Sequence, residues 1–533
     1  MTLCVTEATV SGRMTNFQQT LLPQLEALSE ALPKLRISTS AADRIAYSRD
    51  LWPGGLLELL AGRPDEAPPL GVVWPTDADE LMALVAFARE QRLPLVPFGA
   101  GSGVCKGAVG GRGSLVVDLK GMDRVLWSSP EDNLARVQTG ILGWHLEDAL
   151  AADGLTLGHF PSSLMCSTLG GYLATRSAGQ CSSLYGKIED MVVSVRVVTG
   201  AGQVFETGRD VGPSPGPDWT QLFVGSEGAF GFITEATLRV HPLPELRIYR
   251  AYGFPRVAAG CEAIRRLMQC GVRPAVIRLY DEFDSIVARS SAGKGSEADD
   301  LLKTLLGRLG GPKAWLKRKA LQVALSRPDL TNRLVEELSP HVAATGCLCV
   351  VGYEGDARIA QGSFDVGHGE LLRAGGKDLG EEPGWHWHRH RYSVSFKQSR
   401  IFGAGAFVDT MEVASTWARL MELYDCVRRA ASPHAFVMAH FSHAYPEGCS
   451  IYFTFVGRQG TPSQTREAYL RLWSESLAAA TRAGGTISHH HGVGRAKAGF
   501  MREEHGTSLP LLRTLKQTFD PDGILNPGVL GLA

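Results

Sequence analysis

The sequence predicts an α+β protein with two domains. The chain has 533 residues, which exceeds what one hydrophobic core usually organises. Strand and helix patterns alternate from residue 69 onward, and three glycine-rich stretches each adjoin an apolar strand pattern. We expect a helical segment at 1–66, a ligand-binding domain at 67–245, an α+β cap domain with an antiparallel sheet at 246–480, and a closing segment at 481–533.

Charge and cysteine content exclude several classes of protein. The 54 lysine and arginine residues balance 55 aspartate and glutamate residues, and the formal net charge of -1 argues against a dedicated nucleic-acid binder. The ten cysteines form no C-x-x-C pair and are typical of core thiols in a reducing compartment. The sequence has no apolar run of about 18 residues that would cross a membrane, and residues 1–14 lack an apolar signal core. We expect a cytoplasmic protein.

The first elements follow from periodicity and capping. Apolar residues recur at a helical spacing between 17 and 32, which indicates a covering helix. Residues 71–74 then predict a strand, and a capping sequence at 76–80 precedes a helix at 81–91. Residues 93–98 predict a second strand, which leads into the first glycine-rich stretch.

Two stretches suit a phosphate-bearing ligand. The glycine loop, residues 99–103 (Gly-Ala-Gly-Ser-Gly), lacks the Gly-Lys-Ser/Thr ending of a nucleoside triphosphatase loop and the G-x-G-x-x-G of a Rossmann turn. Residues 160–190 alternate glycines with hydroxyl side chains, so backbone N–H groups can approach a large polar ligand closely. We interpret the segment 160–190 as half of a cofactor site.

A third glycine-rich stretch follows a predicted β-hairpin. Residues 192–199 and 204–205 are strand-like on either side of Gly-Ala-Gly at 200–202. Residues 223–235 then repeat the pattern of glycines beside an apolar strand, which we expect at 236–240. The order of the three stretches therefore suits one α+β ligand-binding unit.

In this order, the three stretches resemble the flavin-binding domain of the vanillyl-alcohol oxidase and p-cresol methylhydroxylase superfamily. The resemblance covers residues 67–245 and implies a two-subdomain FAD-binding domain of the vanillyl-alcohol oxidase type. Some members attach the flavin through a histidine in the glycine loop, where this chain has Ser102 and Gly103, so we expect noncovalent FAD. The residues that the resemblance assigns to FAD are Pro97, Gly99, Ala100, Gly101, Ser102, Gly103, Pro161, Ser162, Ser167, Thr168, Gly170, Gly171, Ala174, Thr175, Ser177, Gly179, Asp190, Glu227, Gly228, Gly231 and Ile233.

The cap domain contains an arginine inside an apolar strand. Strand patterns occur at 248–253, 275–280 and 348–354, and Arg278 lies within the second of them. A buried arginine is costly unless it meets an anion. Arg278 therefore either binds an anionic ligand or forms an internal salt bridge.

Two segments of the cap domain have competing interpretations. Residues 301–325 are amphipathic and locally basic, so they either contact a membrane surface peripherally or form an ordinary solvated helix. In 385–391 (Trp-His-Trp-His-Arg-His-Arg), a strand would place His386, His388 and His390 on one side. There they could bind a metal, or they could pack as a histidine–aromatic cluster.

Two later motifs point to acid–base chemistry. Residues 440–443 are His-Phe-Ser-His, and the histidine turn, residues 488–494, is Ser-His-His-His-Gly-Val-Gly. Three consecutive histidines that open a glycine turn are poorly suited to a core, whereas titratable rings beside an exposed backbone suit proton transfer next to a ligand. Because alternate side chains point in different directions, the three rings need not share one role.

The strings 277–280 (Ile-Arg-Leu-Tyr), 450–455 and 487–494 together resemble the alkylglycerone-phosphate synthases, a flavoenzyme family of ether-lipid synthesis. The resemblance implies exchange of the acyl group of acyl-glycerone phosphate for a long-chain alcohol, through an adduct at flavin N5 and without an electron acceptor. The residues that it assigns to catalysis are Tyr452, His491, His490, His489 and Arg400. The residues that it assigns to the substrate phosphate are Arg278, Arg400 and Lys497.

The alternative is a FAD-dependent D-2-hydroxy acid dehydrogenase or oxidase of the glycolate or D-lactate type, which the closing sequence 519–528 also fits. Zinc-type members of that group use a histidine on the penultimate strand and a Glu-His-Gly turn. Tyr452 and His490 occupy these positions here, so we expect no metal. A flavin-binding protein without catalysis is a third hypothesis.

The resemblances also define the expected partners. We expect a small lipid-like substrate, no nucleic acid, and a second copy of the chain in a homodimer. Peripheral membrane contact through 301–325 would add to the cytoplasmic location.

Overall fold

The computed structural model describes residues 16–62, 68–209, 215–290, 327–330, 332–333, 346–393, 401–402 and 405–532. Arg400 and the segment 301–325, for which the sequence predicts a catalytic role and a membrane contact, lie outside the described residues. The described chain is an α+β protein with four sheets, as predicted. No helix within the described ranges is long and apolar enough to cross a membrane.

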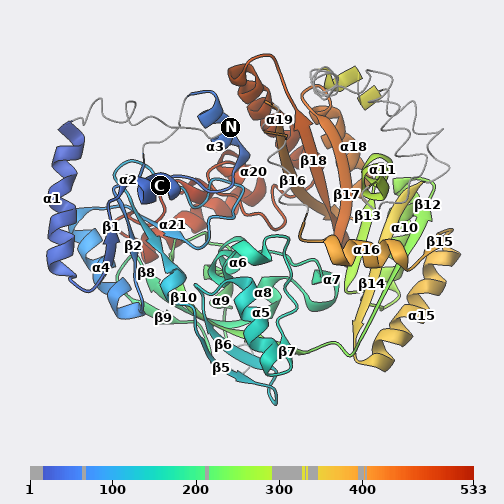
Figure 1. Ribbon diagram of the computed structural model, residues 1–533, viewed down its shortest axis with the longest axis horizontal. Helices are drawn as coiled ribbons and strands as arrows, with labels where there is room; N and C mark the ends of the chain where they lie inside the picture. The colour runs from blue at the N-terminus through green and yellow to red at the C-terminus, as the bar shows by residue number, and fades with distance from the viewer. Residues whose placement is uncertain are drawn as a thin grey trace.

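The first sheet contains four strands in the order β1-β2-β4-β3. These are β1 (Arg36–Ser38), β2 (Gly71–Trp74), β4 (Leu115–Asp118) and β3 (Leu95–Phe98). β4 is parallel to β2 and β3, whereas β1 is antiparallel to β2. Helices α1 (Asn16–Ala31) and α4 (Ala78–Gln91) pack against the sheet (Figure 1). Parallel strands are usually buried on both faces, which explains their continuous apolar sequence.

The second sheet is antiparallel and has the order β5-β6-β10-β8-β9. Its strands are β5 (Val125–Ser129), β6 (Leu134–Gln138), β10 (Gly231–Arg239), β8 (Val192–Thr199) and β9 (Val204–Glu206). β8 and β9 form the predicted hairpin. β10 begins at Gly231, five residues before the predicted strand, so the third glycine-rich stretch runs directly into the sheet. The helices beside this sheet are α5 (Gly143–Ala152), α6 (Leu169–Thr175), α8 (Ile188–Met191) and α9 (Thr220–Phe223), whereas α7 (Ser182–Tyr185) packs on the largest sheet.

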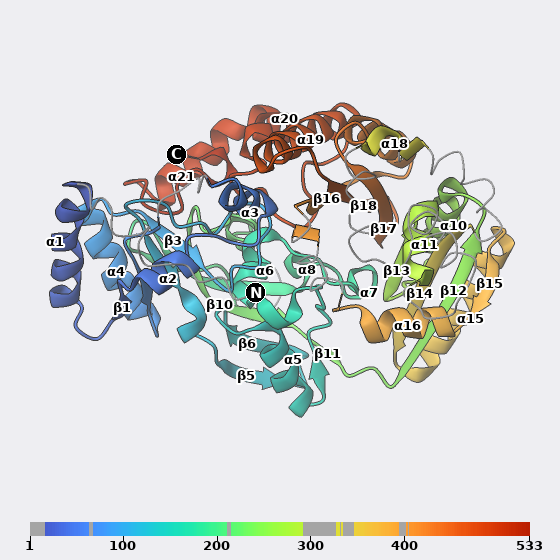
Figure 2. The same cartoon turned by 45° about the horizontal axis from the view of Figure 1, so that its top comes forward.

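The largest sheet is antiparallel and forms the cap domain, with the order β15-β12-β14-β13-β17-β18-β16. Its strands are β15 (Lys377–Gly380), β12 (Leu246–Phe254), β14 (Cys347–Gly355), β13 (Val276–Tyr280), β17 (Phe436–Ala444), β18 (Gly448–Gly457) and β16 (Phe407–Thr416). The helices that cover it are α10 (Val257–Gln269), α15 (Ala357–Arg373), α18 (Leu420–Ala431) and α19 (Pro462–Arg482). Figure 2 shows these helices on the outer side of the curved sheet, whose inner side faces α6 and α7.

Residues 385–390 form part of a helix, α16 (Glu382–His390), so the three histidines do not lie on one side of a strand. A proline in the first turn starts the helix, where its missing N–H is not needed. His386 and His390 are therefore one turn apart, and their rings stack with centroids 4.3 Å apart. Trp385 and His388 instead pack on Tyr249, which corresponds to the predicted histidine–aromatic cluster.

The closing segment returns to the first sheet. The N–H of Leu95 donates to the carbonyl of Ile524, and the N–H of Asn526 donates to the carbonyl of Leu95, both at 2.8 Å. The Asn526 amide also donates to the carbonyls of Gly107 and Glu227, at 3.0 and 2.8 Å. Residues 524–526 therefore join two of the glycine-rich stretches. The remaining elements are α2 (Ala41–Ala46), α3 (Pro53–Leu60), β7 (Leu155–Thr156), β11 (His241–Pro242), α11 (Glu282–Ser290), α20 (Met501–His505) and α21 (Leu509–Phe519).

Candidate active site

A cavity of about 1820 Å³ is lined by all three glycine-rich stretches, by the inner face of the large sheet and by the histidine turn. Its volume exceeds the roughly 300–1,000 Å³ of sites that hold one drug-sized ligand. The cavity can therefore hold a dinucleotide and a second ligand together.

The glycine loop has the geometry of an anion cradle. The carbonyls of Gly101 and Gly103 accept the N–H of Leu51, at 3.1 and 2.9 Å. Among the described residues, the N–H groups of 100–103 have no hydrogen-bond acceptor. Gly101 has φ +68, and a Cβ on Gly99 would collide with the Thr168 hydroxyl. Unpaired N–H groups at glycines that admit no side chain are suited to a diphosphate.

The segment 160–190 supplies the hydroxyl side of the cavity. Thr168 caps α6 and accepts the N–H of Gly171 at 3.2 Å. The buried Ser167 hydroxyl lies 2.8 Å from the Tyr172 hydroxyl. The predicted cofactor residues that line the cavity are Pro97, Gly99, Ala100, Gly101, Ser102, Gly103, Pro161, Ser162, Ser167, Thr168, Gly170, Gly171, Ala174, Thr175, Ser177, Glu227, Gly228, Gly231 and Ile233.

Two predicted cofactor residues lie away from the cavity wall. Gly179 packs against the backbone of Phe160, where an added Cβ would be 2.5 Å from the nitrogen. The Asp190 carboxylate accepts the N–H of Lys187 at 2.8 Å and caps α8. These local contacts give each residue a role in shaping the segment, and its contact with the cofactor stays a prediction.

Tyr452 belongs to a row of side chains across four strands of the large sheet. Tyr280 on β13 is opposite His440 on β17, and His440 is opposite Tyr452 on β18. Tyr452 is in turn opposite Glu412 on β16. Opposite residues project from the same face of a sheet, and Arg278 shares that face because it is two residues from Tyr280. The His440 and Tyr452 rings stack with centroids 4.7 Å apart.

Glu412 holds the histidine turn by its main chain. One carboxylate oxygen accepts the N–H groups of His490 and His491, at 3.0 and 2.5 Å, and the hydroxyl of Ser488 at 2.6 Å. The other oxygen lies 3.0 Å from Nζ of Lys497. Burial acts to raise the pKa of Glu412, but the Lys497 charge and these donors outweigh it and hold the pKa below its usual range. Glu412 is therefore a fixed anion beneath the turn.

The side chains above Glu412 form a neutral cluster. Burial lowers the pKa of His491, with only partial opposition from Glu412. Burial also lowers the pKa of His490 well below its usual range and that of His489 to about 3. Burial raises the pKa of the Tyr452 phenol. Neutral imidazoles can accept protons and a neutral phenol can donate one, so the cluster is equipped for proton transfer.

Two predicted site residues in this region lie outside the cavity wall. Lys497 has no exposed surface and is paired with Glu412, so this geometry gives no support to its predicted contact with a substrate phosphate. His489 also lies outside the cavity wall, and its Nε2 is 3.3 Å from the Tyr445 hydroxyl. The structure brings Tyr452, His490 and His491 together in the cavity wall, and their catalytic roles stay predictions.

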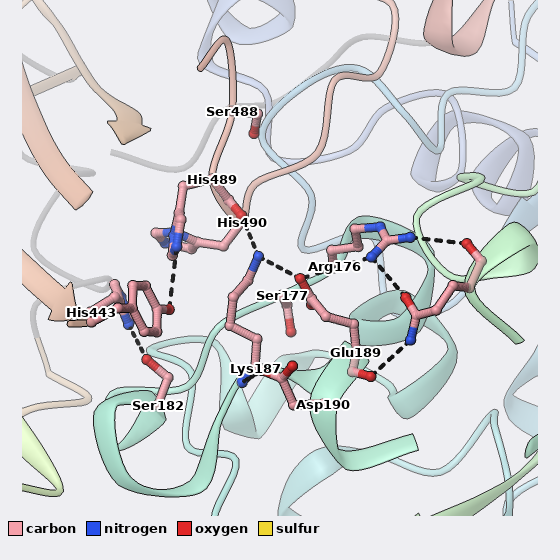
Figure 3. Close-up of polar contacts among 12 residues, drawn as sticks. Arg176, Ser177, Ser182, Lys187, Glu189, Asp190, His443, Ser488, His489 and His490 are labelled. Carbon is pink, nitrogen blue, oxygen red and sulfur yellow. Dashed lines mark hydrogen bonds and ion pairs between the residues drawn. The ribbon is translucent and has the colours of Figure 1, made fainter. Parts of the chain in front are cut away.

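Each end of the histidine turn is hydrogen-bonded to one of the glycine-rich stretches. Figure 3 shows the Lys187 ammonium between the carbonyl of His489, at 2.9 Å, and the carboxylate of Glu189, at 2.7 Å. At the other end, the Glu227 carboxylate accepts the N–H groups of Val493 and Gly494, at 2.6 and 2.8 Å. Burial raises the pKa of Glu227 to about 7. These contacts fix the histidines relative to the glycine-rich stretches.

Arg278 is one of three described arginines that line the cavity, with Arg49 and Arg391, and it projects from the inner face of the large sheet. Its Nη2 lies 3.4 Å from Nδ1 of His440, and its buried Nε has no hydrogen-bond partner among the described residues. The Asp284 carboxylate lies 3.3 Å from the same nitrogen of His440. Burial raises the pKa of Asp284 to about 6, although the charge of Arg278 opposes this. A half-buried guanidinium with an unused donor is suited to an anionic group of a ligand.

Three residues of this site, Glu412, His443 and Lys187, are not predicted from the sequence. Glu412 could be found because it is a charged residue within the apolar strand pattern 407–413, where a buried charge must be paired. His443 belongs to the motif 440–443, but the sequence does not show that its side chain lines the cavity. No local pattern distinguishes Lys187 from a surface lysine.

The comparisons with known proteins agree with this geometry. A family model described as FAD binding domain matches residues 69–208, and one described as FAD linked oxidases, C-terminal domain, matches residues 243–530. The chain is 28% identical over 527 residues to alkyldihydroxyacetonephosphate synthase of Trypanosoma brucei brucei, covering 95% of this chain and 80% of the relative. It is 30% identical over 492 residues to the enzyme of the same name from Dictyostelium discoideum, covering 89% of this chain and 74% of the relative.

A solved structure of an alkyldihydroxyacetonephosphate synthase superposes on the chain with a TM-score of 0.73 at 26% identity, covering 95% of this chain and 84% of that one. The unpaired N–H groups of the glycine loop and the close-packed glycines fit the FAD that the matched families bind. The chain therefore belongs to the FAD-linked oxidase family, uses FAD as its cofactor, and groups within that family with the alkyldihydroxyacetonephosphate synthases.

Proposed function

We propose that this chain is an alkylglycerone-phosphate synthase, the enzyme that the name alkyldihydroxyacetonephosphate synthase also denotes. It would exchange the acyl group of acyl-glycerone phosphate for a long-chain alcohol and release a fatty acid. The observation that carries the proposal is one cavity in which a cofactor cradle adjoins a half-buried guanidinium and a neutral phenol–histidine cluster. A phosphate-bearing substrate whose reaction needs proton transfer requires this combination.

The cofactor would be held noncovalently by the glycine loop and the segment 160–178. The N–H groups of 100–103 suit its diphosphate, and the Thr168 hydroxyl and the residues 227–233 line the adjoining wall. FAD supplies a ring that accepts an electron pair from the substrate carbon and returns it, so the exchange needs no external electron acceptor.

Three polar side chains of the cavity wall have tasks in this reaction. Arg278 would bind the substrate phosphate through its unused Nε and its terminal nitrogens. Tyr452 and His491 would transfer protons, because both line the cavity and are neutral and adjacent, with ring centroids 5.4 Å apart. Arg400 remains a second candidate for the phosphate.

The rest of the cavity wall suits a long apolar chain. Beyond the polar groups, the wall consists largely of apolar side chains of the cap domain, including Leu348, Val350, Leu379, Trp387, Ile401 and Phe402. Burial of apolar surface stabilises binding by about 25 cal/mol per Å², so such a wall favours an alkyl or acyl chain over a small hydroxy acid. The D-2-hydroxy acid dehydrogenase alternative is not favoured, because synthases match the chain at 28% and 30% identity, whereas a glycolate oxidase subunit matches it at 25%.

One experiment tests the proposed reaction. Purified yellow protein is incubated with acyl-glycerone phosphate and labelled hexadecanol, and separately under anaerobic conditions with D-lactate, glycolate and D-2-hydroxyglutarate. We expect label in alkylglycerone phosphate and no loss of flavin colour with any hydroxy acid. Bleaching by a hydroxy acid without labelled ether lipid would refute the synthase proposal.

A variant locates the reaction in this cavity. Tyr452→Phe removes the phenol hydroxyl and should abolish turnover while FAD stays bound. The matched control is Tyr353→Phe, because Tyr353 is buried on β14 and its hydroxyl has no hydrogen-bond partner among the described residues. Full activity of Tyr452→Phe would remove this residue from the mechanism.

The predicted homodimer and the predicted membrane contact belong to the same proposal. Sedimentation of the purified protein tests the first. Flotation with phosphatidylcholine vesicles, compared between the full chain and a variant with a polar 301–325 segment, tests the second. A monomer in the sedimentation experiment would refute the homodimer. Equal flotation of the two proteins would refute the membrane contact through 301–325.

A further inference from the structure

His443 lines the cavity beside two groups of the proposed site. Its ring lies 4.8 Å from the ring of His490, measured between centroids. The residue before it on β17, Ser442, is opposite Arg278 on β13. His443 therefore adjoins both the histidine turn and the guanidinium that we assign to the substrate phosphate.

The backbone of His443 is shaped to place its ring. The register of β17 against β18 shifts between Ser442 and Ala444, so His443 forms a β-bulge. Its φ is +53, a left-handed conformation that is uncommon for residues other than glycine. Bulges redirect side chains next to active sites, and such strained residues cluster at functional sites. The bulge places the ring against Ser182 and in the cavity wall.

The Ser182 hydroxyl fixes the position of the proton on the His443 ring. Oγ of Ser182 lies 2.7 Å from Nδ1 of His443 (Figure 3), and Ser182 is only 2% exposed. Nδ1 is the only hydrogen-bond partner that the described part of the chain gives this hydroxyl. A buried hydroxyl hydrogen without an acceptor is costly, so Ser182 donates and Nδ1 carries no proton. The proton of a neutral His443 ring is then on Nε2.

Nε2 of His443 is a neutral donor that a ligand in the cavity can meet. It has no hydrogen-bond partner among the described residues, and the ring that carries it lines the cavity. Burial lowers the pKa of His443 well below its usual range, with smaller contributions from His489 and Arg278, so the ring is neutral at neutral pH. A neutral imidazole N–H can polarise the carbonyl group of a substrate.

We propose that Nε2–H of His443 donates a hydrogen bond to the ketone oxygen of acyl-glycerone phosphate, and that Ser182 is the positioning residue of this ring. The role rests on the proposed function and identifies the group that binds the reacting carbonyl. In this substrate the ketone carbon lies between the ester-bearing carbon and the phosphate-bearing carbon. The neighbours of His443 correspond to this order, because the histidine turn supplies the proton-transfer groups and Arg278 the phosphate ligand.

The bond changes balance without any net change at His443. The C–H bond of the ester-bearing carbon breaks, and its proton passes to the pair Tyr452 and His491. The electron pair of that bond forms a second bond to the ketone carbon, and the π pair of the carbonyl moves onto its oxygen. Nε2–H stabilises the negative charge that develops on this oxygen, and the ring keeps its proton. A donor that is already oriented needs no reorganisation during the reaction, so it stabilises such a charge strongly.

Histidine NMR tests the tautomer without any substrate. The FAD-bound protein carries ¹⁵N in its histidine rings, and His443→Gly assigns the signals of this residue, because glycine tolerates the left-handed backbone. We expect a protonated Nε2 and an unprotonated Nδ1. In Ser182→Ala the two shifts should approach each other, whereas Ser183→Ala, at the next buried serine, should leave them unchanged. A protonated Nδ1 in the native protein would overturn the proposal, and unchanged shifts in Ser182→Ala would remove Ser182 from it.

Infrared spectroscopy tests the hydrogen bond to the ketone. The probe is 2-oxooctadecyl phosphate with ¹³C at the ketone, which keeps the ketone, the phosphate and a long chain but has no carboxylate to lose. We expect the ketone stretch of the bound probe at a lower wavenumber in the native protein than in His443→Gly. His443→Gln, whose amide can donate, should give an intermediate value. His368→Ala, on α15 and outside the cavity wall, should match the native protein. The same stretch in native protein and His443→Gly, with probe bound to both, would overturn the proposal.

Kinetics provide the third test. His443→Gly should lower kcat by about 10²–10³-fold with little change in KM, as removal of one donor to a developing oxyanion does. With substrate deuterated at the ester-bearing carbon, the isotope effect on kcat should rise in this variant, because proton removal becomes slower relative to the other steps. An unchanged kcat in His443→Gly would refute the role of His443. Absence of ether-lipid synthesis by the native enzyme would refute the proposed function instead, and the NMR and infrared results would still decide on His443.

Discussion

Nζ of Lys497 lies 3.0 Å from Oε2 of Glu412, and neither side chain has exposed surface. Removing two charges from water is expensive, so a buried ion pair contributes little net stability compared with apolar residues of the same shape. Its location beneath the main chain of His490 and His491 gives it another use. The pair holds the histidine turn at a fixed height above the large sheet.

Breaking this ion pair should lower the free energy of unfolding by more than the pair itself contributes to it. Glu412→Gln leaves the Lys497 ammonium buried without a counter-charge, so we expect the free energy of unfolding to fall by about 3–5 kcal/mol. Glu412→Met combined with Lys497→Met should be more stable than the single variant. Urea denaturation measures both, and Glu422→Gln, at an exposed position of α18, is the control. Equal stability of Glu412→Gln and the control would contradict a buried ion pair between Glu412 and Lys497.

Glu227 should make stability fall as the pH rises from about 4.5 to 7. Its pKa is about 7 in the folded protein, because burial outweighs the two N–H donors, and about 4.3 in an unfolded chain. Between these values the folded state binds more protons, so the free energy of unfolding decreases with pH, by about 3 kcal/mol in total. At pH values below both pKa values, Glu227 is protonated in the folded and the unfolded state, so the free energy of unfolding no longer changes with its titration. In Glu227→Gln the slope over this range should be flatter, whereas parallel curves for the two proteins would exclude Glu227 as the cause.

The glycine loop should not tolerate a side chain at Gly101. Gly101→Ala places a Cβ 2.5 Å from the Phe98 ring at a φ of +68, a left-handed conformation that costs a residue with a Cβ about 1–2 kcal/mol. We expect less bound FAD per chain, measured as the ratio of flavin to protein absorbance after gel filtration. Gly362→Ala in α15 is the matched control, since an added Cβ there meets nothing within 4 Å. Equal FAD content in both variants would show that the loop does not shape the cradle.

Arg278 should govern the affinity for the phosphate-bearing substrate. Arg278→Met removes hydrogen bonds to a charged group worth about 1.5–3 kcal/mol, so KM for acyl-glycerone phosphate should rise about 10- to 150-fold. The KM for labelled hexadecanol should change little. Arg358→Met, whose side chain is 93% exposed, controls for the loss of a positive charge. An equal rise for both substrates would indicate a general distortion of the cavity rather than phosphate binding.

Local patterns predict most elements of the fold. The strands at 248–253, 275–280 and 348–354 are found within two residues of their observed bounds, because alternating or continuous apolar residues reflect burial directly. The segment 385–391 is the exception. Its alternating tryptophans and histidines fit a strand, but the preceding Glu-Pro starts a helix whose turns place the tryptophans on Tyr249.

The site is less predictable, because its contacts join distant parts of the chain. The sequence places Lys497 beside the histidine turn, where it fits a phosphate ligand equally well. Its actual partner, Glu412, lies 85 residues earlier on another strand. In the same way, the contact of Ser182 with His443 spans 261 residues, and no periodicity within either segment reports it.

The contacts of Asn526 also determine when the cofactor site can be complete during synthesis. This residue bonds the carbonyl of Gly107, which the ribosome adds 419 residues earlier, and that of Glu227. A nascent chain that has already made the glycine loop, the segment 160–190 and the whole large sheet still lacks the amide that joins Gly107 to the third glycine-rich stretch. A message truncated shortly before the codon for Asn526 would therefore yield a chain that contains all three glycine-rich stretches but lacks this contact at the FAD site.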